Sequence, residues 1–290
     1  MPLDQIDIDK YEYDPSTGSY TPKKEMNLLE HLEELRWHII RALIAVTVIA
    51  VVVFFARDFV FDRILLAPQD DDFASYRFFC WLSAKLGTGE ALCLTPPPFE
   101  IITVQLGEAF LMHIKATFVL AFVVASPYVF WEIWRFVSPG LASREQRFAR
   151  YAVGICSSLF FIGVLFGYFV ISPFAVTFLA NYGFAMEGVI AKVSLTSFVN
   201  YMIMFSVPAG IVFELPIVVW VLAKLGLLTP EFMRQYRRHA IILILMVAAI
   251  ITPPDVVTQI LIGMPLYVLY EISISICARV VKQREAEMLA

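Results

Sequence analysis

Long stretches without charge constrain this chain more than any other feature. Residues 151–179 contain no charged side chain, and residues 194–222 contain one, Glu214. A helix rises about 1.5 Å per residue, so about 20 apolar residues cross the hydrocarbon layer of a bilayer. Charged residues make up 17% of the chain, against about 25% in soluble domains. The sequence therefore predicts an all-α membrane protein.

Six membrane-spanning helices are predicted. The region between His239 and Arg279 is too long for one span, and Pro253 and Pro254 predict a turn within it, because proline lacks a backbone donor and disfavours helix before it. The fifth span is then only 12 residues long, or about 18 Å as a helix. The predicted spans are residues 39–56, 109–131, 151–179, 194–222, 240–251 and 256–278.

The distribution of Lys and Arg predicts the orientation. These residues gather before the first span, in the loops after the second and fourth spans, and after the last span. One short loop on the opposite side carries Lys192, and the other carries neither residue type. This is the positive-inside pattern, and it predicts that both termini are cytoplasmic. The outer loop at residues 57–108 is a weaker test, because long loops follow the rule poorly.

The two ends of the chain are predicted to lie outside the membrane domain. Residues 1–25 are polar and acidic and contain Pro15 and Gly18, a composition typical of a disordered tail. The six-span domain is predicted to occupy residues 26–282, and residues 283–290 to form a cytoplasmic C-terminal tail.

The motifs of common enzyme classes are absent from the sequence. There is no G-x-x-x-x-G-K-[ST] nucleotide loop, no H-E-x-x-H zinc motif and no G-x-S-x-G nucleophile elbow. The four histidines are scattered, and no dense basic block indicates nucleic-acid binding. We therefore expect neither enzymatic activity, nor a metal or other cofactor, nor a nucleic-acid partner.

Two acidic motifs lie in segments predicted on the cytoplasmic side. Glu33-Glu34-Leu35-Arg36 precedes the first span, and Arg144-Glu145 lies in the loop after the second. Acids at a helix start are favoured by the helix dipole, and a surface ion pair contributes little stability. From the residues alone, a solvated helix entry and a loop ion pair stand as alternatives to a binding role.

Glu214 is the acidic residue inside a span. A carboxyl group near mid-bilayer costs about 2.5–3.5 kcal/mol on insertion scales, so its default interpretation is functional. Pro208 and Pro216 flank it and are expected to kink the helix, which helps to form a concave surface. A hydrogen-bonded packing residue is the alternative.

The four cysteines divide by location. Cys80 and Cys93 lie in the outer loop, on the predicted oxidising side, so a disulfide between them is a hypothesis. Cys156 and Cys277 lie within predicted spans and are interpreted as packing residues.

Six short motifs occur in a fixed order among the predicted spans. They are His31-Leu32-Glu33-Glu34-Leu35-Arg36; Ala67-Pro68; Phe136-Val137-Ser138-Pro139-Gly140-Leu141 with Arg144-Glu145; Phe213-Glu214-Leu215-Pro216; Leu228-Thr229-Pro230-Glu231; and Thr252-Pro253-Pro254-Asp255. One such motif is weak evidence, whereas the ordered series is specific. From about Met26 to Lys282 the chain resembles the TatC family, the polytopic core subunit of the twin-arginine protein translocase.

The resemblance implies a fold, a function and partners. The fold is a cup-like bundle of six helices in the bacterial cytoplasmic (inner) membrane. The function is to bind twin-arginine signal peptides of folded cargo proteins and, with TatA- and TatB-type single-span subunits, to move the cargo across the membrane using the proton motive force. It also implies self-association in the assembled complex.

The matching motif positions imply roles for particular residues. Glu34 and Glu145 would contact the signal arginines through charge-assisted hydrogen bonds. Phe136 would line the same site, and Arg36 would orient Glu34. Glu214 would face the concave groove, where the signal's apolar stretch or a partner helix lies. Structural roles are implied for Pro68, Pro139, Pro216, Pro253, Pro254 and Asp255.

Two departures from the family pattern stand out. The place of a frequent second arginine in the entry motif is taken by His38, with Arg41 one turn further along. Residues 70–98 look like extra sequence in the outer loop, either a flexible insert or a short helix around Tyr76–Leu86. Two other function classes remain open from the residues: a small-solute transporter that uses Glu214 as a proton site, and a passive scaffold that recruits partners.

Overall fold

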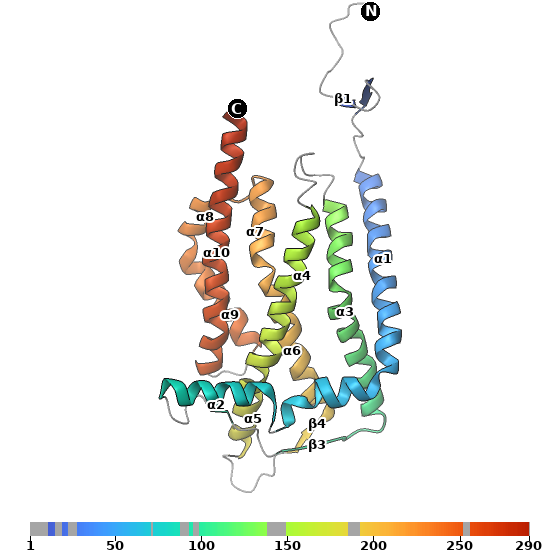
Figure 1. Cartoon of the computed structure of the whole chain (residues 1–290), viewed down its shortest axis with the longest axis vertical. Coiled ribbons are helices and arrows are strands. Elements are labelled where there is room, and N and C mark those ends of the chain that lie inside the picture. Colours follow the sequence, from blue (N-terminus) through green and yellow to red (C-terminus); the bar gives the residue numbers. More distant parts are fainter. Residues whose placement is uncertain are drawn as a thin grey trace, which may run out of the picture.

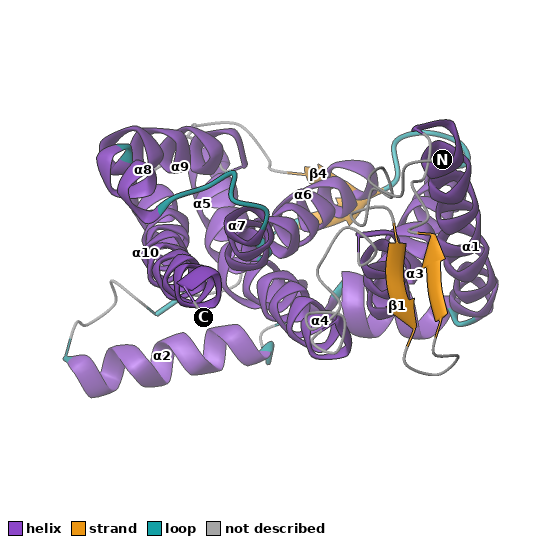
Figure 2. Cartoon of the chain, turned by 90° about the horizontal axis from the view of Figure 1, so that it is seen from above, coloured by secondary structure: helices purple, strands orange, loops and turns teal. Residues whose placement is uncertain are grey.

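A computed structural model of the whole chain describes residues 11–14, 19–22, 28–70, 72–87, 93–94, 99–137, 149–184, 192–251 and 256–289. Most of its helices run roughly along one axis (Figure 1). We call the end where α1 begins and α10 ends the upper end, and the opposite end, which α2 crosses, the lower end (Figure 1). Seen from above, α1 and α3 lie on one side of the bundle, and α8, α9 and α10 lie on the other (Figure 2).

Within the described residues, five helical stretches are long and apolar enough to cross a membrane: Glu33–Phe55, Glu108–Val137, Ala152–Leu179, Leu195–Lys224 and Ile262–Arg284. They confirm a multi-pass helical bundle. The underlying elements are α1 (Leu28–Phe55), α3 (Glu108–Val137), α4 (Ala149–Phe166) continued by η7 (Gly167–Ile171) and α5 (Ser172–Phe184), α6 (Leu195–Phe213) continued by α7 (Leu215–Lys224), and α10 (Val256–Leu289).

A short helix occupies the place of the predicted fifth span, and it is not among the five stretches named above. It is α9 (Arg237–Ile251), which has 15 residues and would rise about 22 Å. The short helix α8 (Pro230–Gln235) precedes it, capped by the Thr229 hydroxyl, which accepts from the Phe232 N–H at 3.3 Å. The Gln259 amide of α10 donates to the Leu245 carbonyl of α9 at 3.2 Å and ties the pair together.

The segment after α1, predicted to be an outer loop and here called the outer segment, folds across the lower end of the bundle. It contains η2 (Phe59–Leu65), η3 (Ala67–Gln69), α2 (Ala74–Leu86) and β3 (Glu100–Ile102), and β3 pairs in parallel with β4 (Lys192–Ser194). Helix α2 lies crosswise to the long helices in both views (Figures 1 and 2). Pro68 is buried at the start of η3, and its carbonyl accepts from the Tyr76 hydroxyl at 2.8 Å. Helix α2 thus confirms the short-helix alternative for this loop.

The N-terminal segment contains structure that the prediction of a disordered tail missed. Strands β1 (Tyr11–Asp14) and β2 (Ser19–Pro22) form an antiparallel pair in which Tyr13 lies opposite Tyr20. Tyr and Thr favour strands, and Pro15–Gly18 supplies turn-forming residues between them. The prediction was wrong for these strands because the average polar composition of residues 1–25 concealed this local pattern.

Candidate functional site

The entry motif occupies the first turns of α1 at the upper end. Glu34 is half-buried, whereas Glu33 and Arg36 are exposed. Glu34 lies six residues after the first residue of α1, and its half-buried carboxylate remains open to a positively charged ligand. Glu145, its predicted partner, lies outside the described residues, as does Pro139, so the predicted acidic pair stays a prediction.

One helical turn further along, α1 is joined to α3 through a buried polar pair. The Nδ1 atom of His38 lies 2.5 Å from Oε2 of Glu132, and the two side chains are 8% and 2% exposed. Arg41 and Arg135 each bring a guanidinium nitrogen to 3.7 Å from the same carboxylate, and the Tyr128 hydroxyl hydrogen-bonds to it. A buried charge is costly unless it is paired, so these neighbours account for the presence of Glu132.

Phe136 lies at the end of α3, next to this pair. It is half-buried, and its ring meets the His38 ring edge-on with centroids 6.2 Å apart. The contact brings the predicted site residue Phe136 against α1, two residues after Arg36. The upper ends of α1 and α3 therefore carry Glu34, Arg36 and Phe136 on adjoining helices, with His38 and Glu132 between them.

Glu214 occupies the break between α6 and α7. Pro216 follows at the start of α7 and is buried. The Glu214 carboxyl group lies beside the Cys156 thiol and the Phe160 backbone of α4, and the residue is 9% exposed. Among the described residues, its Oε1 atom has no hydrogen-bond partner. The Cys156 sulfur also accepts from the Trp134 indole at 3.4 Å, so the carboxyl joins a buried cluster between α3, α4 and α7.

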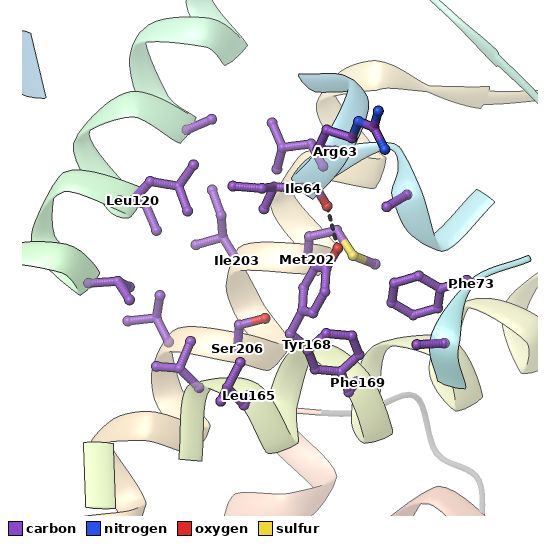
Figure 3. Close-up of a pocket in the computed structure, with 18 of the residues that line it drawn as sticks. Arg63, Ile64, Phe73, Leu120, Leu165, Tyr168, Phe169, Met202, Ile203 and Ser206 are labelled. Carbon is purple, nitrogen blue, oxygen red and sulfur yellow. Dashed lines mark hydrogen bonds between the residues drawn. The ribbon is translucent and has the colours of Figure 1, made fainter. Parts of the chain in front are cut away.

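An apolar cavity lies in the lower half of the bundle. Its volume is about 670 Å³, and its walls are mostly apolar side chains of α3, α4, η7 and α6, with Arg63 and three acidic side chains from the outer segment. Figure 3 shows Leu120, Tyr168 and Ser206 converging on it, with the Tyr168 hydroxyl donating to the Ile64 carbonyl. The Ser206 hydroxyl is buried and has no hydrogen-bond partner in the part of the chain that the structure describes. Glu214 is not among the residues that line this cavity.

The structure describes some of the remaining predicted residues and not others. In the structure a disulfide joins Cys80 of α2 to Cys93, and Cys156 and Cys277 are buried free thiols. The predicted turn at Pro253, Pro254 and Asp255 lies outside the described residues, between α9 and α10.

Two buried carboxylates are important to this geometry and were not among the predicted site residues. Glu132 lies one residue past the predicted second span. Glu108 accepts hydrogen bonds from the N–H groups of Val104 at 2.6 Å, Gln105 at 3.1 Å and Thr196 at 2.7 Å, and so ties the start of α3 to the start of α6. For Glu132 the available signal was an acid inside the apolar run Phe130-Trp131-Glu132-Ile133-Trp134.

Comparison with protein families gives one match over most of the chain. Residues 30–265 match the family model described as Sec-independent protein translocase protein (TatC). A relative named TatC from Blattabacterium sp. subsp. Periplaneta americana is 32% identical over 268 residues, covering 90% of this chain and 98% of the relative. TatC from Aquifex aeolicus is 34% identical over 250 residues, covering 86% and 93%.

Solved structures give the same result. A crystal structure of the twin-arginine translocase receptor TatC superposes with a TM-score of 0.63 at 31% identity, covering 86% of this chain and 98% of the other. A crystal structure of the same receptor in DDM gives a TM-score of 0.67 at 33% identity, covering 84% and 98%.

Proposed function

The chain belongs to the TatC family of Sec-independent protein translocase proteins, and we propose that it is the receptor that binds twin-arginine signal peptides at the upper ends of α1 and α3. The observation that carries the proposal is the half-buried Glu34 beside an α1–α3 contact that also holds Phe136. The solved relatives, which are twin-arginine translocase receptors, support the same assignment.

The proposed chemistry is recognition of two guanidinium groups by two carboxylates. Guanidinium presents a planar fork of donors that matches a carboxylate, which an ammonium group does not. Glu34 and Glu145 accept from the paired arginines, Arg36 orients Glu34, and Phe136 packs against the peptide. No covalent step is required of this subunit.

The apolar part of the signal peptide needs a binding surface of its own within the bundle. We propose that the apolar stretch after the arginines enters the apolar cavity between α3, α4 and α6, whose walls supply the matching surface. TatA- and TatB-type single-span subunits dock near the α6–α7 break at Glu214, and self-association completes the complex. The proton motive force drives transport of the folded cargo.

We further propose that the chain lies in the bacterial inner membrane with its upper end in the cytoplasm. The upper end contains Arg36 near the start of α1, Lys224 at the end of α7, and Arg279, Lys282 and Arg284 toward the end of α10. Positive residues favour the cytoplasmic side, and that is also the side from which a cytoplasmic signal peptide approaches.

Site-specific crosslinking tests the location of the binding site. A photo-reactive residue in place of Phe136 is expected to capture a twin-arginine signal peptide in membranes and to capture its twin-lysine version much more weakly. Glu34→Ala is expected to lower the yield, whereas the matched control Glu33→Ala, in an exposed position one residue earlier, leaves it unchanged. Equal yields for the two peptides would refute the recognition mechanism.

A further inference from the structure

Two half-exposed arginines on different helices meet at one buried carboxylate. The side chains of Arg41 on α1 and Arg135 on α3 are 44% and 53% exposed, and each places a guanidinium nitrogen 3.7 Å from an oxygen of Glu132, whose side chain is 2% exposed. Arg41 approaches Oε2 and Arg135 approaches Oε1, so the two guanidinium groups lie on either side of the same carboxylate.

The hydrogen-bonding capacity of these arginines is largely unused. A separation of 3.7 Å exceeds hydrogen-bond range, and the carboxylate instead hydrogen-bonds to His38 at 2.5 Å and to Tyr128. Within the described part of the chain, neither guanidinium donates a hydrogen bond to protein. Each guanidinium has five N–H donors, so the two together present two sets of donors to an outside anion.

The charge of the cluster favours an anionic ligand. Arg41 and Arg135 contribute +2 and Glu132 contributes −1, so these three side chains together carry a net positive charge. Glu132 is buried behind the arginines, so this positive charge is presented outward. A phosphate diester carries −1 and accepts from both guanidinium groups, whereas a zwitterionic headgroup brings an additional positive charge.

The helix faces next to the arginines match a lipid molecule. Along α1, Arg41 is followed one and two turns deeper by Ile44 and Val48, which are 56% and 60% exposed. Along α3, Trp131 and then Val124 continue the face of Arg135 toward the membrane centre, at 39% and 56% exposure. Arginine and tryptophan side chains can contact a phospholipid headgroup, and the exposed aliphatic side chains below them can contact its acyl chains. The order of these side chains along the helices therefore matches the order of groups in a phospholipid.

We propose that Arg41 and Arg135 form a binding site for the phosphate of a net-anionic phospholipid, with its acyl chains along the exposed faces of α1 and α3. Basic sites between membrane helices are suited to anionic headgroups. The lipid would complete the surroundings of the Glu132 cluster from the membrane side and brace the α1–α3 contact beneath Phe136. The site faces lipid and requires no signal peptide, so it can be tested separately from the proposed function.

Native mass spectrometry of the purified full-length protein tests this site. Delipidated protein in detergent is titrated with phosphatidylglycerol or phosphatidylcholine, and the bound fraction is counted. Wild type is expected to retain phosphatidylglycerol preferentially, and Arg41→Gln with Arg135→Gln is expected to weaken that binding roughly tenfold. The matched control is Arg238→Gln, which removes an exposed arginine of α9.

A second variant is expected to keep or strengthen lipid binding, whereas the double arginine variant weakens it. It therefore shows whether a change in this cluster lowers lipid binding merely by disturbing the fold. Glu132→Gln removes the one negative charge of the cluster and keeps an oxygen for His38, so it is expected to bind phosphatidylglycerol at least as tightly as wild type. Weaker binding by this variant, equal retention of the two lipids by wild type, or unchanged binding by the double variant would overturn the proposal. Displacement of the lipid by an equal concentration of glycerol phosphate would also overturn it, because the ligand would then be a soluble phosphate ester.

Discussion

At the scale of single residues, the buried polar side chains link the helices of this bundle. Glu132 is surrounded by His38, Arg41, Arg135 and Tyr128, so its removal leaves several polar groups without their shared partner. An unsatisfied buried polar group costs more than the net gain from an average hydrogen bond. The consequences of substitution therefore differ between isosteric and truncating changes.

Glu132→Ala is expected to lower the stability of the protein by about 1–3 kcal/mol, the usual cost of leaving a buried partner unsatisfied. Glu132→Gln should cost less, because its amide oxygen still accepts from His38. The measurement is the thermal unfolding midpoint in detergent, with the exposed Glu33→Ala as a control. Equal midpoints for wild type and Glu132→Ala would show that the cluster does not hold α1 to α3.

Glu214→Gln separates packing from a role of the charge or proton. The amide keeps the shape beside Cys156, so folding and insertion should be normal, whereas crosslinks to TatA- and TatB-like partners should change. Glu214→Ala is expected to be more damaging, because it also leaves a space in the cluster of α3, α4 and α7. Position-specific partner crosslinking in membranes is the readout, with signal-peptide crosslinking as the internal control. Wild-type partner crosslinks in both variants would assign Glu214 to packing alone.

At the scale of residues, the sequence indicated single acidic residues, but it did not indicate which side chains contact each other in the fold. Glu214 stands out because it interrupts an apolar span, and Glu34 because it lies in a recognisable motif. His38 and Glu132 are 94 positions apart, and their pairing depends on how α1 packs on α3. Single-sequence patterns carry no information on that packing, so His38 was read only as a departure from the entry motif.

At the scale of elements, the close contact of α4 and η7 with α6 is the main feature of the packing. Gly163 and Gly167 lie on the face of α4 and η7 that meets α6. A Cβ atom at Gly163 would lie 2.8 Å from the Gly210 Cα, and one at Gly167 would lie 2.6 Å from the Ser206 Cα. Small residues four apart allow the backbones of membrane helices to approach closely, and the Glu214 site lies along this α4–α6 contact.

Gly167→Ala is expected to force α4 and α6 apart and to cost about 1–3 kcal/mol, the range for overpacking a filled interior. Gly154→Ala is the matched control, since it lies on α4 with nothing within 4 Å of the added carbon. Both variants are compared by thermal unfolding in detergent. Equal stability of the two would contradict the close contact drawn between these helices.

The positions of the long helices were predictable from the sequence, because the length and apolarity of a run of residues determine whether it can span a membrane. The long spans follow from apolar runs with few or no charges, and α9 was located by the proline pair that follows it in the sequence. The β1–β2 pair was missed, because two strands of four residues leave little trace in composition. The parallel β3–β4 pair joins segments about 90 residues apart, and no local pattern specifies such a pairing.

The proposed orientation of the whole molecule rests on its charge distribution and is testable independently of function. A reporter enzyme that is active only outside the cytoplasm should be active when fused after residue 255 and inactive when fused after residue 290. The physical reason is the basic residues that flank the upper end. Activity in the reverse pattern would invert the proposed topology and place Glu34 on the wrong side for a cytoplasmic signal peptide.

The central claim is that carboxylates at the upper end recognise paired arginines, and equilibrium binding tests it most directly. The protein in lipid nanodiscs is titrated with a fluorescent twin-arginine signal peptide and with its twin-lysine version. We predict at least tenfold tighter binding of the arginine form, about 1.4 kcal/mol, and loss of that preference in Glu34→Gln with Glu145→Gln. Equal affinities of wild type for the two peptides, or an undiminished preference in the double variant, would contradict the account.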